Sequence, residues 1–73
     1  MVTRNTVIGR VYSTPQSRNG WAWLNSINAW RRVATTSTDG HSNTFLALAA
    51  ARGMGTVRVD TDSADQFIVA VYV

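Results

Sequence analysis

The segment 42–55, SNTFLALAAARGMG, constrains the fold most, because it is the only stretch of the chain with helical periodicity. At about 100° per residue, one side of the predicted helix carries Phe45, Leu48, Ala49 and Arg52. The opposite arc carries Asn43, Ala47, Ala50, Ala51 and Met54, and Leu46 lies between the two sides. The outer side of a surface helix in a monomer is normally charged, whereas no charged residue precedes Arg52 here. We therefore expect both sides to be covered.

The uncharged, small-residue side of this helix predicts a homo-oligomer. In a chain of 73 residues, the protein's own sheet can cover one side of the helix and leaves little chain for the other. Other copies of the chain would then cover the second side. The expected subunit interface consists of Ala47, Ala50, Ala51 and Met54. The alternative is a helix rich in alanine for its propensity alone, with its small side facing water.

Strand-like segments come before and after the helix. Three precede it and two follow it: residues 6–13, 21–26, 29–35, 56–60 and 66–73. Gly9 predicts a bulge or tight bend inside the first of them. The candidate helix caps are Ser37 or Ser42 at the start and Gly53 or Gly55 at the end. A five-stranded barrel with a helix between strands 3 and 4 is the OB-fold. The sequence therefore predicts one mainly β (α+β) OB-fold domain over residues 1–73.

The last predicted strand, QFIVAVYV, is uncharged and apolar on both faces. Such a strand would favour aggregation if it lay at the edge of a sheet. Pairing with a neighbouring subunit would remove that hazard, which agrees with the oligomer expected from the helix.

The residue types present argue against an enzyme, a cofactor and a metal site. The chain has no cysteine, so disulfides, thiol chemistry and Cys-based zinc sites are excluded. His41 is the only histidine, and no serine lies in a nucleophile-elbow sequence. We expect His41 to be a neutral loop residue, because the start of a helix disfavours its charged form. The run D-x-D-x-x-D at 60–65 lacks the glycine and glutamate of a calcium loop and predicts a solvated turn.

Charge and hydropathy give further limits. The net charge of +3 permits an anionic partner without requiring one. No apolar run approaches the ~20 residues of a membrane span, so no membrane insertion is expected. The N-terminal residues MVTRNTV lack the apolar core of a signal peptide. The protein is either not secreted by that route or is a mature form with a start methionine supplied.

Three tryptophans between positions 21 and 30 make binding more plausible than catalysis. Trp21 and Trp23 share one strand face. If that face is outside, the rings can stack on sugars or nucleobases, and Arg31 or Arg32 can hold an anionic group such as a sialic acid carboxylate. The alternative places the face in the barrel core or at a subunit interface. Loop 36–42 offers groups suited to sugar hydroxyls. The candidate contacts are Trp21, Trp23, Trp30, Arg31 and Asp39.

The second half of the chain resembles the pentameric B subunits of Shiga-type toxins. The resemblance is carried by LALAAARGMGTVRVDT, a polar turn and FIVAVYV, and more weakly by V-x-G-[RK]-V at residues 7–11. It implies a ring of five OB-folds whose helices line a central pore and whose sheets join edge to edge. It also implies shallow glycan sites on one face, secretion, and an A-type toxin subunit as a partner.

The chain also departs from that family. The toxin subunits carry a disulfide, an acidic first hairpin and a binding-site tryptophan just before the helix. This chain has no cysteine, has Arg18, Asn19 and Gly20 in the hairpin, and has TSTDGHS before the helix. Of the family's hairpin positions only Thr14 matches, so Thr14 joins the candidate glycan contacts and the other positions do not carry over.

The sequence therefore predicts a non-catalytic, glycan-binding subunit of a ring-shaped homo-oligomer, with a pentamer favoured and cell-surface carbohydrate as the ligand. One alternative is an OB-fold module for single-stranded nucleic acid, which uses tryptophan stacking and arginine contacts. The modest charge and the uncharged helix argue against it. Another alternative is a structural ring that binds no ligand.

Overall fold

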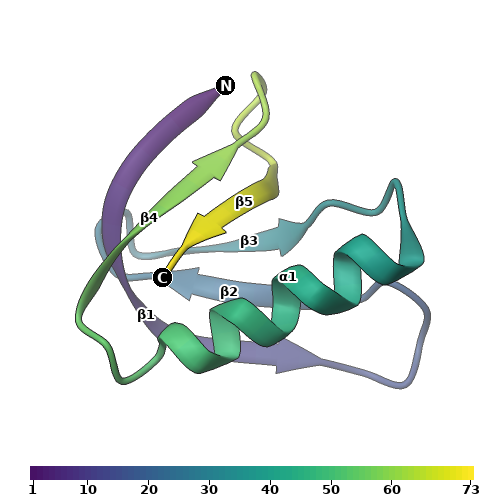
Figure 1. Ribbon diagram of the computed structural model, residues 1–73. Helices are drawn as coiled ribbons and strands as arrows, with labels where there is room; N and C mark the ends of the chain where they lie inside the picture. The colour runs from purple at the N-terminus through teal and green to yellow at the C-terminus, as the bar shows by residue number, and fades with distance from the viewer.

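Five strands and one helix make up the fold, and the computed structural model describes them for residues 1–73. Their order along the chain is β1 (Val2–Ser13), β2 (Gly20–Leu24), β3 (Ala29–Val33), α1 (Thr38–Ala51), β4 (Thr56–Thr61) and β5 (Phe67–Tyr72). The strands close into a barrel in the order β1-β2-β3-β5-β4, and α1 comes between the third and fourth strands (Figure 1). This is the mainly β, five-stranded OB-fold architecture that the sequence predicts.

β1 is the longest strand and pairs with two neighbours in turn. Residues 2–7 pair antiparallel with β4, and residues 8–13 pair antiparallel with β2. The register shifts between Ile8 and Arg10, so the bulge predicted at Gly9 is confirmed. A bulge bends its strand and increases the local twist, which lets one strand serve both sides of a small barrel.

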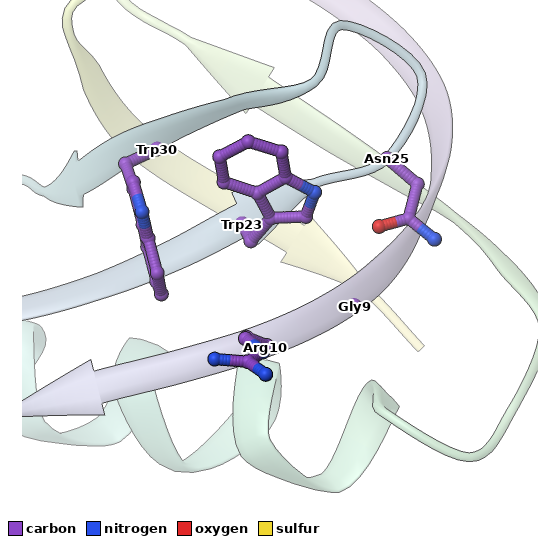
Figure 2. Close-up of a pocket in the computed structure, with 5 residues that line it drawn as sticks. All are labelled: Gly9, Arg10, Trp23, Asn25 and Trp30. Carbon is purple, nitrogen blue, oxygen red and sulfur yellow. The ribbon is translucent and has the colours of Figure 1, made fainter.

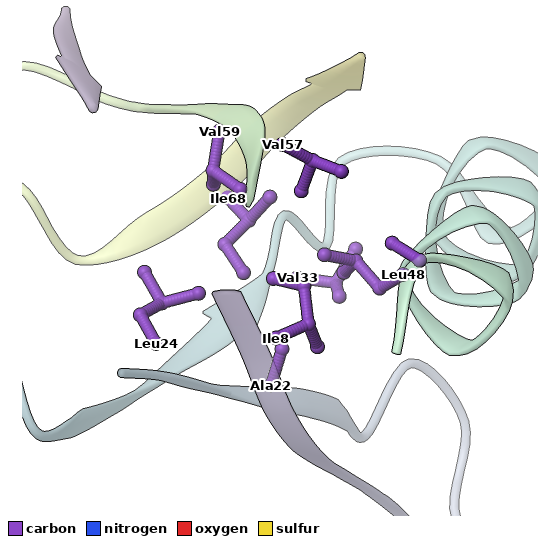
Figure 3. Close-up of a cluster of buried hydrophobic side chains, with 9 residues drawn as sticks. Ile8, Ala22, Leu24, Val33, Leu48, Val57, Val59 and Ile68 are labelled. Carbon is purple, nitrogen blue, oxygen red and sulfur yellow. The ribbon is translucent and has the colours of Figure 1, made fainter. Parts of the chain in front are cut away.

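The barrel interior holds one apolar cluster (Figure 3). Its nine members are Ile8, Ala22, Leu24, Val33, Leu48, Ala51, Val57, Val59 and Ile68. Val57 and Val59 point inward while Arg58 is exposed, as the alternation of β4 predicts. Figure 3 shows Leu48 reaching from α1 toward the side chains of the strands, so the helix closes the barrel with an apolar plug.

The helix begins earlier and ends earlier than residues 42–55. Ser37 is its N-cap, with φ −143° and ψ 132°, and Ser37 Oγ accepts a hydrogen bond of 3.1 Å from the backbone N–H of Gly40. Arg52 is the C-cap, and Gly55 follows in the left-handed region with φ 78°. Of the two predicted N-caps, Ser37 is therefore the correct one, and the capping bond explains the added turn.

The side of α1 that faces the core differs in part from the predicted side. The buried helix residues are His41, Leu48 and Ala51, whereas Arg52 is exposed. The expectation that Ala51 lies in a subunit interface is wrong, because its side chain is fully buried in the subunit's own core. Residues 41, 48 and 51 lie on one side of a helix at about 100° per residue, and this side packs on the barrel.

The outer side of α1 is uncharged over its length after the first turn. Leu46 is 65% exposed and Met54, just beyond the helix, is 61% exposed. Ala50 is exposed and Ala47 is half-buried. The interface predicted for Ala47, Ala50 and Met54 stays a prediction for these three residues.

His41 lies inside α1 and is buried, so the expectation of a loop residue is wrong. The backbone N–H of Gly20 donates to His41 Nε2 at 2.9 Å, and His41 Nδ1 lies 3.0 Å from the carbonyl oxygen of Ala34. Because Nε2 accepts, the ring proton belongs on Nδ1, which donates to Ala34. The imidazole thereby ties the helix to the start of β2 and to the chain just after β3.

β5 is a strand of the barrel wall and is paired on both sides over part of its length. It pairs antiparallel with β4 at four positions and parallel with β3 at two, Phe67 and Ile68. Strand pairing within the chain therefore covers part of the edge that was expected to favour aggregation. Beyond Ile68 the edge that faces β3 has no strand partner, and Val69 and Tyr72 are exposed there.

Candidate ligand-binding site

The tryptophans of β2 point out of the barrel. Ala22 and Leu24 are fully buried, and alternation along the strand places Trp21 and Trp23 on the opposite, outer face. The core alternative for this face is thereby excluded. Strand pairing lines up two rows across β1, β2 and β3: Tyr12, Trp21 and Arg32, and then Arg10, Trp23 and Trp30. We call these six side chains the aromatic face.

The rings of the aromatic face pack edge to face. The ring centroids of Trp23 and Trp30 are 5.7 Å apart with an interplanar angle of 76°, and those of Tyr12 and Trp30 are 6.3 Å apart at 67°. This arrangement places the positive edge of one ring against the negative face of another. Trp30 is still 37% exposed, so the rings support one another and leave surface for a ligand.

A hollow of about 500 Å³ opens beside the second row (Figure 2). It is lined by Gly9, Arg10, Trp23, Asn25 and Trp30. The indole rings supply apolar walls, and a guanidinium and an amide supply polar groups. A volume of this size is ordinary for a site that binds a small ligand. A second hollow of about 330 Å³ lies between Tyr12, Trp21 and Trp30 on the same face.

The bulge in β1 shapes the larger hollow. A side chain at Gly9 would collide with Asn25 Oδ1, so glycine leaves the space in which the amide of Asn25 lies. The bulge also shifts the alternation by one residue, so that Arg10 and Tyr12, which follow it, point outward. Gly9 therefore contributes to the site through the space that it leaves open.

The two arginines of the aromatic face differ in their contacts. Arg32 lies 5.8 Å from the ring centroid of Trp21 and donates to the carbonyl oxygen of Arg18 at 2.7 and 3.1 Å. Trp21 Nε1 also donates to Asn19 Oδ1 at 2.9 Å. Trp21 and Arg32 are therefore held in place by bonds within the chain. Arg10 makes no side-chain hydrogen bond or ion pair with the rest of the chain.

Arg31, expected to contact a ligand, points away from the aromatic face. It pairs in register with Ala22 on the inner side, and its Nη2 donates to Asp65 Oδ2 at 3.2 Å. Arg4 donates to both oxygens of Asp65 at 2.9 and 3.0 Å, and Thr61 Oγ1 bonds Oδ1 at 2.6 Å. The Arg4 bonds, then Thr61 and Arg31, hold the pKa of Asp65 well below its ordinary value. Arg31 is thus part of an ionic cluster that joins β1 and β3 to the turn between β4 and β5.

Thr14 and Asp39, the other two non-aromatic candidates, also lie apart from the aromatic face. Thr14 Oγ1 accepts a bond of 2.7 Å from Asn19 Nδ2 inside the turn between β1 and β2. It lines a separate hollow of about 360 Å³ against Thr38 and Phe45 of α1. Asp39 is exposed in the first turn of the helix. Of the predicted contacts, the structure brings together Trp21, Trp23 and Trp30.

Four residues of this region, Gly9, Arg10, Tyr12 and Asn25, were missed as site residues. Gly9 carried a usable signal, since a predicted bulge implies that the inward and outward positions exchange beyond it. Arg10 and Tyr12 could have been placed outward on that ground. Asn25 follows β2 in a turn, and no sequence pattern links it to Gly9.

The titratable side chains of His41 and Asp62, outside the aromatic face, make bonds within the chain. Both ring nitrogens of His41 are engaged by backbone groups. Asp62 Oδ1 accepts from the backbone N–H groups of Gln66 and Phe67, at 2.9 and 3.4 Å, and so shapes the turn before β5. No three histidine or carboxylate side chains come together as metal ligands. The helix lacks the length and apolar character that crossing a bilayer requires.

Comparison with known proteins adds nothing to this geometry. No protein-family model, curated protein or solved structure matches the chain. The likeness to toxin B subunits therefore stays a prediction from the sequence.

Proposed function

We propose that this chain is a non-catalytic, carbohydrate-binding subunit of a ring-shaped homo-oligomer. The observation that carries the proposal is the hollow between Trp23 and Trp30, with Arg10 and Asn25 beside the rings on the outer face of the barrel. It combines apolar walls with a few convergent polar groups, which is the usual composition of a small-ligand site.

The chemistry of the hollow fits a sugar. A pyranose ring has an apolar face of C–H groups, which stacks on an indole, and a rim of hydroxyls that need donors and acceptors. Arg10 offers five N–H donors, and Asn25 offers both an acceptor oxygen and two donors. The hollow is open to solvent, which suits the terminal residue of a cell-surface glycan.

Two free strand edges support assembly into a ring. β5 has no β3 partner beyond Ile68, and β1 has no β4 partner beyond Val7. If the β5 edge of one copy pairs with the β1 edge of the next, the contact is heterologous, and a heterologous contact closes into a ring when its rotation allows. Five copies, and an A-type toxin subunit that the ring would deliver, are the further expectations from the resemblance.

The outer side of α1 supports the same assembly. Exposed Leu46 and Met54 add apolar area, and the small side chains of Ala47 and Ala50 allow neighbouring helices to approach closely. An uncharged helix surface of this kind is stabilised when another copy covers it.

A glycan array with purified protein tests the binding proposal, with Trp23→Ala as the loss-of-function variant. Binding should be competed by a free sugar and should disappear in Trp23→Ala. Val7→Ala, which truncates an exposed apolar side chain away from the aromatic face, is the control and should bind normally. An assembled protein that binds no glycan at all would contradict carbohydrate binding and favour the structural-ring alternative.

A single-stranded nucleic acid is the second candidate, because the aromatic face lies on strands that OB-folds use for oligonucleotides. Four rings with Arg10 and Arg32 among them form the kind of surface on which successive bases stack. If these two arginines contact phosphates, the binding constant for an oligothymidine should fall as salt is added. A plot of its logarithm against the logarithm of the salt concentration should have a slope of about −1.4. Glycan binding that is competed by a free sugar, with no binding of the oligothymidine, excludes this candidate.

A further inference from the structure

We infer that the sugar bound in the larger hollow carries a carboxylate, and that Arg10 is the residue that selects it. The inference rests on the proposed function and names the ligand class of the same site. Three features carry it: the pairing of the arginines, the balance of donors and acceptors in the hollow, and the shape of the guanidinium.

Most arginines of this chain already have internal partners. Arg4 and Arg31 pair with Asp65, and Arg58 pairs with Asp60. The guanidinium groups of Arg18 and Arg32 donate to backbone carbonyls at Thr35 and Arg18. Arg10 and Arg52 are the two that make no such bond. Of these, only Arg10 lines a hollow with aromatic walls.

No acidic residue lines the hollow. The charge of Arg10 is therefore not offset by a neighbouring carboxylate, and the indole rings beside it provide low-dielectric walls that strengthen its field. An anionic group that enters the hollow gains from this field, whereas a neutral group gains much less.

The hollow is also rich in side-chain donors and poor in acceptors. Arg10 supplies donors only, and Asn25 Oδ1 is the one strong side-chain acceptor among the lining groups. Sites for neutral sugars need acceptors for hydroxyl protons. A ligand that brings its own acceptors, as a carboxylate does, matches this set better.

The shape of the guanidinium suits a carboxylate. The planar guanidinium can hold both oxygens of a carboxylate through two parallel N–H···O bonds. Figure 2 shows the guanidinium of Arg10 in the space bounded by Trp30, Trp23 and Gly9, with the amide of Asn25 toward the other end of the hollow. A sugar that stacks on Trp23 can therefore direct its carboxylate to Arg10 and a hydroxyl to Asn25 Oδ1.

The test measures affinity by isothermal titration calorimetry for matched pairs of acidic and neutral sugars. Sialyllactose is compared with its methyl ester and with lactose, and methyl glucuronide is compared with methyl glucoside. We expect the acidic member to bind about 10-fold or more tightly, since a hydrogen-bonded charge pair contributes more than a neutral bond. The two acidic sugars distinguish a sialic acid from a uronic acid as the source of the carboxylate.

Arg10→Gln and Arg52→Gln complete the test as a matched pair of variants with the same change in net charge. Arg10→Gln should bring the affinity for the acidic sugar down to that for the neutral one, and Arg10→Lys should restore only part. Arg52→Gln should change neither. Both side chains are exposed, so folding should survive and is checked by tryptophan fluorescence.

Equal affinity for acidic and neutral sugars, or equal losses in Arg10→Gln and Arg52→Gln, would overturn the inference. If neutral sugars bind and Trp23→Ala abolishes that binding while Arg10→Gln has no effect, the proposed function stands and the inference fails. If no sugar binds to the wild-type protein, the proposed function fails and the inference falls with it.

Discussion

Replacing Leu48 by alanine should remove the apolar plug that α1 places in the barrel. Leu48 is fully buried, and such a substitution typically costs about 2–5 kcal/mol through lost transfer energy and the cavity left behind. A domain of 73 residues has roughly 4–11 kcal/mol of total stability at ordinary values per residue. Leu48→Ala should therefore remove a large part of the stability and in the weaker case unfold the protein.

Leu46→Ala is the matched control on the same helix. Leu46 is 65% exposed, so within one subunit its truncation should cost less than about 1 kcal/mol. Urea unfolding followed by tryptophan fluorescence, at several protein concentrations, measures both variants. The free energy of unfolding falls by about 1 kcal/mol per molar urea for a domain of this size. The urea midpoint of Leu48→Ala should therefore lie about 2–5 M below that of the wild type, or the variant should be unfolded without urea.

Similar midpoints for Leu48→Ala and Leu46→Ala at low concentration would refute the packing described for α1. A Leu46→Ala midpoint that lies below the wild-type midpoint at high protein concentration, with a difference that disappears on dilution, would instead indicate that this side chain stabilises the contact between subunits.

Three further predictions concern assembly, the helix start and acid stability. Ala50→Arg should dissociate the assembly in native mass spectrometry, because it places a charge on the expected helix contact; an unchanged oligomer mass would refute that contact. Ser37→Ala should lower stability by about 1 kcal/mol in thermal unfolding, and Ser37→Gly by only a few tenths, since the cap accepts the N–H of Gly40. The pKa of Asp65 is lowered by Arg4, Thr61 and Arg31, so its stabilisation is complete above the ordinary value of 3.8 and is lost as pH falls below it. Asp65→Asn should therefore be less stable at neutral pH and lose less stability on acidification than the wild type, as urea unfolding at both pH values would show; an equal acid-dependent loss would contradict the ionic cluster.

Local chemistry accounts for the parts of the fold that the sequence predicts correctly. The order of strands and helix follows from residue alternation and turn signals, which act over a few neighbouring residues. The bulge at Gly9 and the inward positions of Val57 and Val59 follow in the same way. These features need no knowledge of which distant segments meet.

Which residues form the candidate site depends on how the barrel closes, more than the order of the elements does. Both faces of β2 are apolar, so the alternation of Trp21 and Trp23 with Ala22 and Leu24 left open which pair faces the core. The narrow interior of a five-stranded barrel accepts Ala22 and Leu24, and the large indole rings lie outside. Hydropathy ranks both kinds of side chain as apolar, and only the available volume separates them.

The elements, their order and the bulge follow from residues that are close together in the chain, whereas the roles of the polar residues and of the helix sides depend on how distant segments pack. Arg31 faces Asp65 across 34 positions of sequence, and Arg10 reaches the tryptophans through strand register. Ala51 entered the core because Ser37 caps the helix and His41 anchors it to the barrel. The physical reason is common to all of these cases: an ion pair, a pocket wall and a buried helix side each depend on which distant segments meet, and barrel closure sets those meetings.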